Sequence, residues 1–110
     1  MTAYAIADMR EVSMGPEIVT YLERIDETLA PYGGKFIVHG GKVTEVEGSW
    51  SSTIIIIKFP DREQVKAWYE SPAYQAILPL RTENSVSNVI VVDGVDEDHR
   101  ATDVLNVTTP

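Results

Sequence analysis

The 110-residue sequence contains no cysteine, and this absence excludes a large group of functions. Without thiols the chain has no disulfide framework, no thiolate nucleophile and no cysteine-ligated zinc or iron–sulfur centre. Histidine is nearly as scarce, with two residues, and neither has a second histidine or a carboxylate at a spacing typical of metal sites. We therefore expect no metal and no other cofactor.

Basic residues and long apolar runs are also few. Nine lysines and arginines stand against 17 aspartates and glutamates, which gives a net charge of −8. Because nucleic-acid affinity depends on cations that meet phosphates, this chain is a poor candidate for binding nucleic acid. The longest apolar run, Ile54–Ile57, is far too short to cross a membrane, and residues 1–10 lack the features of a secretory signal. These observations favour a cytoplasmic protein without a membrane partner.

The length and composition suit one domain followed by a short tail. A chain of this size can bury one hydrophobic core, and its hydrophobic share of 44% is ordinary for a globular protein. The last residues are acidic and include Asp96, Glu97, Asp98 and Asp103. We expect residues 1–95 to form the domain and residues 96–110 to form a loosely ordered tail.

The stretch SMGPEIVTYLERIDETLAPYGG predicts the first helix, which follows a strand at TAYAIADM. Ser13 is the candidate N-cap, and Pro16 suits the first turn, where its missing N–H is not needed. Pro31 and the left-handed backbone available to Gly33–Gly34 end the helix. Because this glycine pair follows a helix, it is not a phosphate-binding loop. Four apolar residues recur at helical spacing and give the helix one buried face: Ile18, Leu22, Ile25 and Leu29.

The second half of the sequence predicts three more extended segments and a second helical region. KFIVH and KVTEVE flank Gly40–Gly41, which either closes a two-residue hairpin or bends one long strand through a bulge. The bend is favoured, because GSWSS is a better-sized turn into the next strand, STIIIIKFP. DREQVKAWYESPAYQAILPL predicts a helix capped by Asp61, with a break at Ser71–Pro72 that starts a second short helix. VSNVIVVDG is the last strand.

This order is the βαββαβ arrangement of an α+β, ferredoxin-like sandwich, in which two helices cover one face of a four-stranded antiparallel sheet. Strands with one wet face alternate apolar and polar residues, but Ile54–Ile57 and Val89–Val92 do not. Both faces of these two strands, taken as the central ones, must therefore be dry. We expect the uncovered face to pair with a second copy and form a dimeric α/β barrel; the less favoured alternative is a monomer with an apolar open face.

Two side chains are candidates for moving a proton. His39 as a general base would need an orienting partner, either Glu47 or Asp8, and the plainer interpretation is a histidine at the sheet surface. Asp8 ends the first strand among apolar neighbours. It is either a partly buried carboxylate with a raised pKa or the cap of the following loop.

Topology also indicates where a ligand would bind. The first strand ends, the third begins and the second helical region ends at one edge of the sheet, which places Asp8, Trp50 and Arg81 there, with Ser71–Tyr74 adding aromatic surface. Arg81 can clamp a ligand carboxylate, or it can pair with Asp8 or Glu83. Four aromatic residues can stack on a planar ligand, although core packing is the plainer interpretation: Trp50, Trp68, Tyr69 and Tyr74.

Taken in order, the segments YGGKFIVHGG, EGSW, KFP, AWYESPAYQ and LR resemble a bacterial family, domain-of-unknown-function family 1330, over residues 2–94. The resemblance implies a dimeric α/β barrel. It also implies an arginine in many relatives at the position of His39, which argues against a required catalytic histidine. The wider fold group includes cofactor-free monooxygenases, haem-degrading enzymes, lactone isomerases and stress-responsive binding proteins, so kinship does not transfer a reaction. The positions that match the pattern mark a ligand pocket: Trp50, Trp68, Tyr69, Ser71, Tyr74 and Arg81.

Two functions follow as expectations. The first is a metal-independent enzyme that acts on a small planar or aromatic substrate, with Asp8 or His39 moving a proton and Arg81 anchoring an anionic group. The second is a non-catalytic, small-molecule-binding or stress-related dimeric module that uses the same pocket. A third option is a structural protein whose cleft is filled by its own side chains or by the tail.

Overall fold

The computed structural model describes residues 1–106, so the last four residues of the predicted tail lie outside the described part of the chain. Residues Ala30–Tyr32 (η1) and Ala101–Asn106 (η2) form short 3-10 helices. The main elements follow the predicted order: β1 (Ala3–Val12), α1 (Pro16–Leu29), β2 (Lys35–His39), β3 (Thr53–Phe59), α2 (Arg62–Glu70), α3 (Pro72–Thr82) and β4 (Ser85–Asp93).

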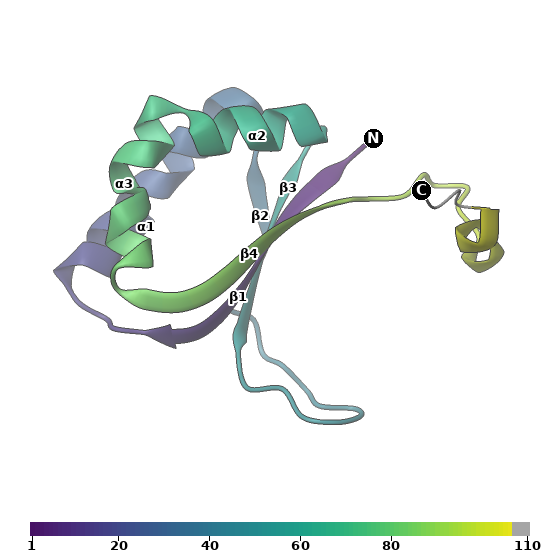
Figure 1. Cartoon of the computed structure of the whole chain (residues 1–110), viewed down its shortest axis with the longest axis horizontal. Coiled ribbons are helices and arrows are strands. Elements are labelled where there is room, and N and C mark those ends of the chain that lie inside the picture. The colour runs from purple at the N-terminus through teal and green to yellow at the C-terminus, as the bar shows by residue number, and fades with distance from the viewer. Residues whose placement is uncertain (107–110) are drawn as a thin grey trace.

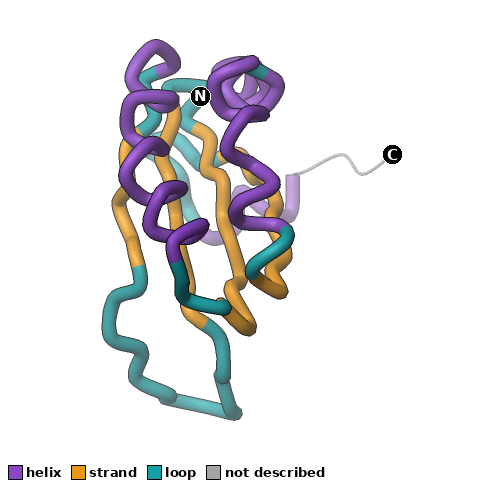
Figure 2. The backbone as a smooth tube through the Cα atoms, turned by 90° about the vertical axis from the view of Figure 1, so that its left-hand side faces the viewer, coloured by secondary structure: helices purple, strands orange, loops and turns teal. Residues whose placement is uncertain are grey.

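The four strands form one antiparallel sheet in the order β2-β3-β1-β4. All three α-helices lie on the same face of this sheet, and no α-helix of residues 1–106 covers the opposite face (Figures 1 and 2). The predicted ferredoxin-like α+β fold is confirmed. The assignment of Val89–Val92 to a central strand is wrong, because β1 and β3 occupy the centre and β4 lies at an edge.

The strand register assigns alternate residues to the two faces of the sheet. Ala5 pairs with Ile57 on β3, and both are buried beneath the helices. The next residue, Ile6, pairs with Ile56 on one side and Ile90 on the other, so this row points away from the helices. Ile90 is 57% exposed. The uncovered face is therefore apolar, as the lack of alternation in the sequence predicts.

Helix α1 begins later than predicted and ends as expected. Its N-cap position is Gly15, and Pro16 lies in the first turn. The predicted N-cap at Ser13 is wrong. The backbone N–H of Ser13 instead donates to the Asn84 carbonyl at 2.8 Å, which holds Ser13 beside the start of β4. The helix gives way to η1, which contains Pro31. Gly33 then adopts a left-handed conformation with φ of 71°, which confirms the predicted stop.

The predicted long bent strand through Gly40–Gly41 is wrong, and so is the hairpin alternative. Strand β2 ends at His39, residues 40–52 form a loop, and the irregularity in β2 falls between Phe36 and Val38. Gly40 has φ of 70° and still donates its N–H to the Ile54 carbonyl at 3.0 Å, so the chain leaves the sheet at this point. A polar contact within the loop, from the Trp50 N–H to Glu45 Oε2 at 2.7 Å, takes the place of strand pairing.

The predicted break in the second helical region is confirmed. Asp61 caps α2, because its Oδ1 accepts from the Gln64 N–H at 2.9 Å. Ser71 has an extended backbone that ends α2, and its hydroxyl accepts from the Tyr74 N–H at 3.2 Å, which caps α3. With Pro72 in the first turn, α3 starts immediately and runs for 11 residues, two more than α2.

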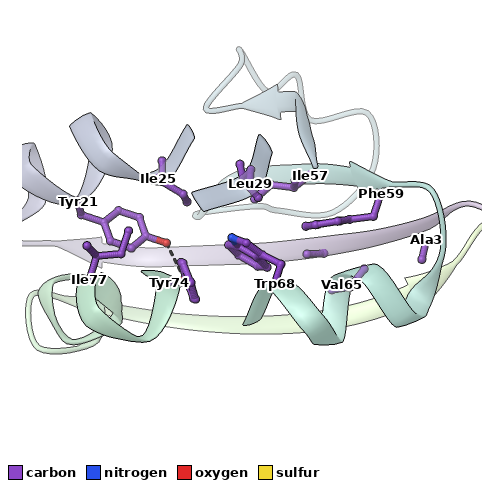
Figure 3. Close-up of a cluster of buried hydrophobic side chains, with 11 residues drawn as sticks. Ala3, Tyr21, Ile25, Leu29, Ile57, Phe59, Val65, Trp68, Tyr74 and Ile77 are labelled. Atoms are coloured by element: carbon purple, nitrogen blue, oxygen red, sulfur yellow. Dashed lines mark hydrogen bonds between the residues drawn. The ribbon is translucent and has the colours of Figure 1, made fainter. Parts of the chain in front are cut away.

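The core lies between the helix layer and the sheet (Figure 3). Trp68 is at its centre, with its ring centroid 4.1 Å from that of Tyr74 and 5.5 Å from that of Phe59. Its buried indole N–H donates to Thr28 Oγ1 at 3.0 Å, so the polar edge of this ring is satisfied inside the core. The sequence interpretation of Trp68 as a packing residue is therefore confirmed.

The tightest backbone position in this core provides a stability test. A Cβ at Gly34 would lie 2.7 Å from Leu29 Cδ2 and 2.8 Å from Phe59 Cε2, both in fully buried side chains. We expect Gly34→Ala to lower the free energy of unfolding by about 1–3 kcal/mol in urea titrations. The matched variant Gly41→Ala, where nothing lies within 4 Å of the added Cβ, should not destabilise the protein. Equal losses in both variants would contradict this account.

Candidate functional site

A cavity of about 300 Å³ lies between the helix layer and the sheet. Its walls are almost entirely apolar, and residues from all four strands and from α1, α2 and α3 line it. The sheet contributes Ala5, Ala7, Met9, Phe36, His39, Thr53, Ile55, Ile57 and Val89, and the helices contribute Ile18, Tyr21, Leu22, Ile25, Trp68, Tyr69, Tyr74 and Arg81. A concave, apolar space of this size with few polar groups suits a small-molecule ligand.

One end of the cavity carries the buried cation Arg81, in the last turn of α3. Its side chain is 8% exposed, and Nη1 donates to the Ser87 hydroxyl on β4 at 2.9 Å. Within residues 1–106, no carboxylate lies within 4.0 Å of this guanidinium. The alternative pairings with Asp8 or Glu83 are therefore not formed. The predicted position near the end of β1 and the start of β3 is confirmed, because Met9 and Thr53 line the same cavity.

Two buried tyrosines lie beside this arginine. The Tyr21 hydroxyl on α1 and the Tyr74 hydroxyl on α3 are 2.7 Å apart and hydrogen-bonded, as the dashed line in Figure 3 marks. Burial raises the pKa of Tyr21 strongly, and Tyr74 raises it further, while Arg81 offsets part of the shift. Burial acts to lower the pKa of Arg81, but the two phenol oxygens outweigh it and the pKa of Arg81 is raised. The end of the cavity thus holds two buried phenols beside a permanent positive charge.

His39 lies on β2, at the opposite side of the cavity from β4. Its ring is exposed and stacks on Phe36, with the ring centroids 4.3 Å apart and the planes at 11°. No hydrogen bond joins it to either of the orienting partners that the sequence suggests, Glu47 or Asp8. The histidine is therefore held by aromatic stacking, and its ring nitrogens make no hydrogen bond to side chains in the described part of the chain.

Asp8 and Trp50 lie outside the cavity. Asp8 pairs with Ile54 and Asn88 in the register of the uncovered face, where its Oδ2 accepts from Asn88 Nδ2 at 3.3 Å and from Arg10 Nε at 3.4 Å. Its other oxygen, Oδ1, is shielded from solvent and makes no well-oriented hydrogen bond.

The charged form of Asp8 is favoured. The neighbouring Ser52 hydroxyl, followed by Asn88 and Arg10, keeps the pKa of this carboxyl below its usual range despite partial burial. The expectation of a raised pKa is wrong, and so is the alternative of a loop cap, because the side chain bonds across strands. Trp50 is half-exposed in the 40–52 loop, where its indole N–H donates to the Ser52 carbonyl at 2.9 Å.

The remaining candidates differ in whether they line the cavity. The aromatic rings of Trp68, Tyr69 and Tyr74 line it, although Trp68 and Tyr74 also belong to the core. Ser71 does not line it and acts as the N-cap of α3. Sequence reasoning missed Tyr21, whose position three residues after Ile18 and four before Ile25 places it on the same apolar face of α1.

Within residues 1–106, no three side chains of metal-ligating type form a group that could hold a metal ion. In the same part of the chain, none of the helices combines the length and apolar character needed to span a bilayer.

The three α-helices on one face of a four-stranded antiparallel sheet, with an aromatic cavity between the layers, define a ferredoxin-like α+β protein with a ligand-sized pocket. The chain belongs to the family described as Domain of unknown function (DUF1330), whose sequence pattern matches residues 2–95. The resemblance noted in the sequence is therefore confirmed. Comparison with curated proteins gave no match.

Solved structures with little sequence identity share this fold. A protein of unknown function from Rhodopseudomonas palustris has a TM-score of 0.64 at 15% identity, with 86% of this chain and 83% of that chain covered. A dimeric ferredoxin-like protein from Jannaschia sp. CCS1 has a TM-score of 0.68 at 13% identity, covering 86% and 100%. SnoaB, a cofactor-independent oxygenase from Streptomyces nogalater, has a TM-score of 0.56 at 14% identity, covering 90% and 97%.

The buried tyrosine pair predicts how stability depends on alkaline pH. Because the pKa of Tyr21 is higher in the folded protein, the unfolded chain loses this proton first as the pH rises above about 10. Unfolding then releases a proton, so this group lowers the free energy of unfolding by up to about 1.4 kcal/mol per pH unit. We expect Tyr21→Phe to show a shallower decline above pH 10 in urea titrations, each protein being referenced to its own value at pH 7. Identical declines would contradict the burial of Tyr21.

Proposed function

We propose that this protein is a homodimer whose cavity binds a small planar or aromatic molecule, on which it acts as an enzyme without a metal. The observation that carries the proposal is a ligand-sized, aromatic-lined cavity that ends at a buried arginine with no carboxylate partner in the described residues. A core filled only for stability would have closed this space, since protein interiors pack to crystal-like density. An open cavity with one polar end is what a binding site requires.

The chemistry available to this cavity is limited to its few polar side chains. His39 is the proton-transfer candidate that lines it, whereas Asp8 faces the other side of the sheet and would act only on a ligand bound there. The similarity to a cofactor-independent oxygenase supports an enzyme that relies on the reactivity of its substrate. The absence of an orienting partner for His39 favours the second candidate function, a non-catalytic binding module.

The dimer in this proposal is formed through the uncovered face of the sheet. Its central row, Ile6, Ile56 and Ile90, is apolar across three neighbouring strands. Contiguous apolar surface of this kind is costly in water and marks protein interfaces. The description of the Jannaschia protein as dimeric supports the same assembly here.

The proposed dimer interface can be tested by introducing one charged side chain on the uncovered face. Ile90 is exposed in the single chain, so Ile90→Asp should leave the fold intact but place a charge in the sheet-to-sheet contact. We expect sedimentation equilibrium at micromolar concentration to show a dimer for the wild type and a monomer for Ile90→Asp. The matched variant Val19→Asp, on the exposed side of α1, should remain dimeric. A wild-type monomer would refute the proposed assembly.

The binding function can be tested by filling the cavity. Ala7 lines its floor on the central strand β1, and Ala7→Phe would occupy that space, whereas Ala76→Phe places the same ring on the exposed surface of α3. We expect 2-naphthol at millimolar concentration to raise the melting temperature of the wild type and of Ala76→Phe but not of Ala7→Phe. If no compound in a panel of planar aromatic molecules raises the melting temperature of the wild type, the proposed binding function is wrong.

The enzyme and the binding module differ in turnover. The compound from that panel with the largest thermal shift is incubated with protein in air, and its absorbance spectrum is followed. An enzyme predicts a spectral change that is lost in Ala7→Phe and reduced in His39→Phe. A stable spectrum with a retained thermal shift would assign the protein to the non-catalytic class.

A further inference from the structure

The fixed charge that lines the cavity is of one sign, positive. Among the described residues that line it, Arg81 is the only fixed charge, and none is an aspartate or glutamate. Ser87 and the two phenols stabilise Arg81, but no carboxylate of the described residues supplies an opposite charge to this buried cation. A ligand that brings one planar oxyanion would supply the missing charge, and a carboxylate matches the fork of N–H groups on a guanidinium.

The tyrosine pair adds a hydrogen-bond donor at the same end. Tyr21 and Tyr74 share one hydrogen bond at 2.7 Å, so only one of their two hydroxyl protons is used between them. The second proton is available to a ligand atom beside Arg81. Both tyrosines are buried. The free hydroxyl proton can therefore be donated to an oxygen of a bound ligand, which is no longer hydrated by bulk water.

The shape of the cavity follows from a row of residues that crosses the whole sheet. Val89 on β4 pairs with Ala7 on β1, Ala7 pairs with Ile55 on β3, and Ile55 pairs with His39 on β2. All four line the cavity. Four strands span three inter-strand spacings, so the floor extends about 14 Å from β4 to β2. Arg81 is anchored on β4 through Ser87, two residues before Val89, and is therefore at the opposite end from His39.

We propose that the ligand of this cavity is an elongated planar aromatic monoanion, whose carboxylate pairs with Arg81 while a polar group at its far end reaches His39. This inference rests on the proposed binding function and adds the charge, shape and orientation of the ligand. The small side chains of Ala5 and Ala7 leave space for a flat ring system over the central strand, and the apolar walls supply no other group that would hold a charge.

The experiment compares three probes that differ at one end each: 6-hydroxy-2-naphthoate, 2-naphthoate and methyl 2-naphthoate. Binding is measured by quenching of tryptophan fluorescence, since Trp68 lines the cavity. We expect the methyl ester to bind about ten- to a hundredfold more weakly than 2-naphthoate, because it cannot form the charged pair with Arg81. The 6-hydroxyl should strengthen binding several-fold through His39.

Variants assign each effect to its residue. Arg81→Met should remove the preference for the acid over the ester, while the matched variant Arg24→Met, at an exposed arginine on α1, should keep it. His39→Phe should remove the gain from the 6-hydroxyl, measured as the ratio of the affinities for 6-hydroxy-2-naphthoate and 2-naphthoate in the same variant. If Arg81→Met fails to fold, the comparison of acid with ester in the wild type still decides whether the cavity prefers a carboxylate.

The outcomes separate this inference from the proposed function. Equal binding of acid and ester by the wild type would overturn the inference and leave the planar-ligand function standing. A 6-hydroxyl effect that persists in His39→Phe would overturn the assigned orientation. Loss of all binding, including that of 2-naphthol, would overturn the proposed function itself.

Discussion

The small side chains on the helix-facing side of β1 determine much of this molecule. Ala3 and Ala5 are buried beneath the aromatic cluster, and Ala7 lies on the floor of the cavity. Because only a methyl group rises from each of these three positions, large rings such as Trp68 can pack at one end and open space remains at the other. Larger residues in this row would fill the cavity, since a core at native density has no room for both.

The sheet has two apolar faces but only one helix layer. The helix-facing side is satisfied within the chain by Ile57, Phe59 and the aromatic rings from α2 and α3. The other side presents Ile6, Ile56 and Ile90, which no helix of the described chain, residues 1–106, covers. The hydrophobic effect acts on both faces equally, so the same strands that organise the core also favour association.

The polar end of the cavity shows how a charge is kept inside an otherwise apolar site. Arg81 donates to Ser87 and lies beside the phenols of Tyr21 and Tyr74, and this polar surrounding offsets part of the cost of burial. The break at Ser71 makes the arrangement possible, because it starts a new helix that directs both Tyr74 and Arg81 toward the cavity. In an unbroken helix from Arg62 to Thr82, the side chains of Tyr74 and Arg81 would point in other directions.

The sequence alone determined the element order, the helix cap at Asp61, the helix break at Ser71, and the apolar character of both sheet faces, because these depend on local periodicity and on hydrogen bonds between near neighbours. It also marked Trp68, Tyr69, Tyr74 and Arg81. It could not place Asp8 on the far face, since a strand residue points to one side or the other according to register, and register depends on pairing with distant strands. Nor could it foresee that Tyr21 meets Tyr74, 53 residues away, across two helices. Tertiary packing decided which side chains surround the cavity, because only the stacking of the helix layer on the sheet brings them within contact distance.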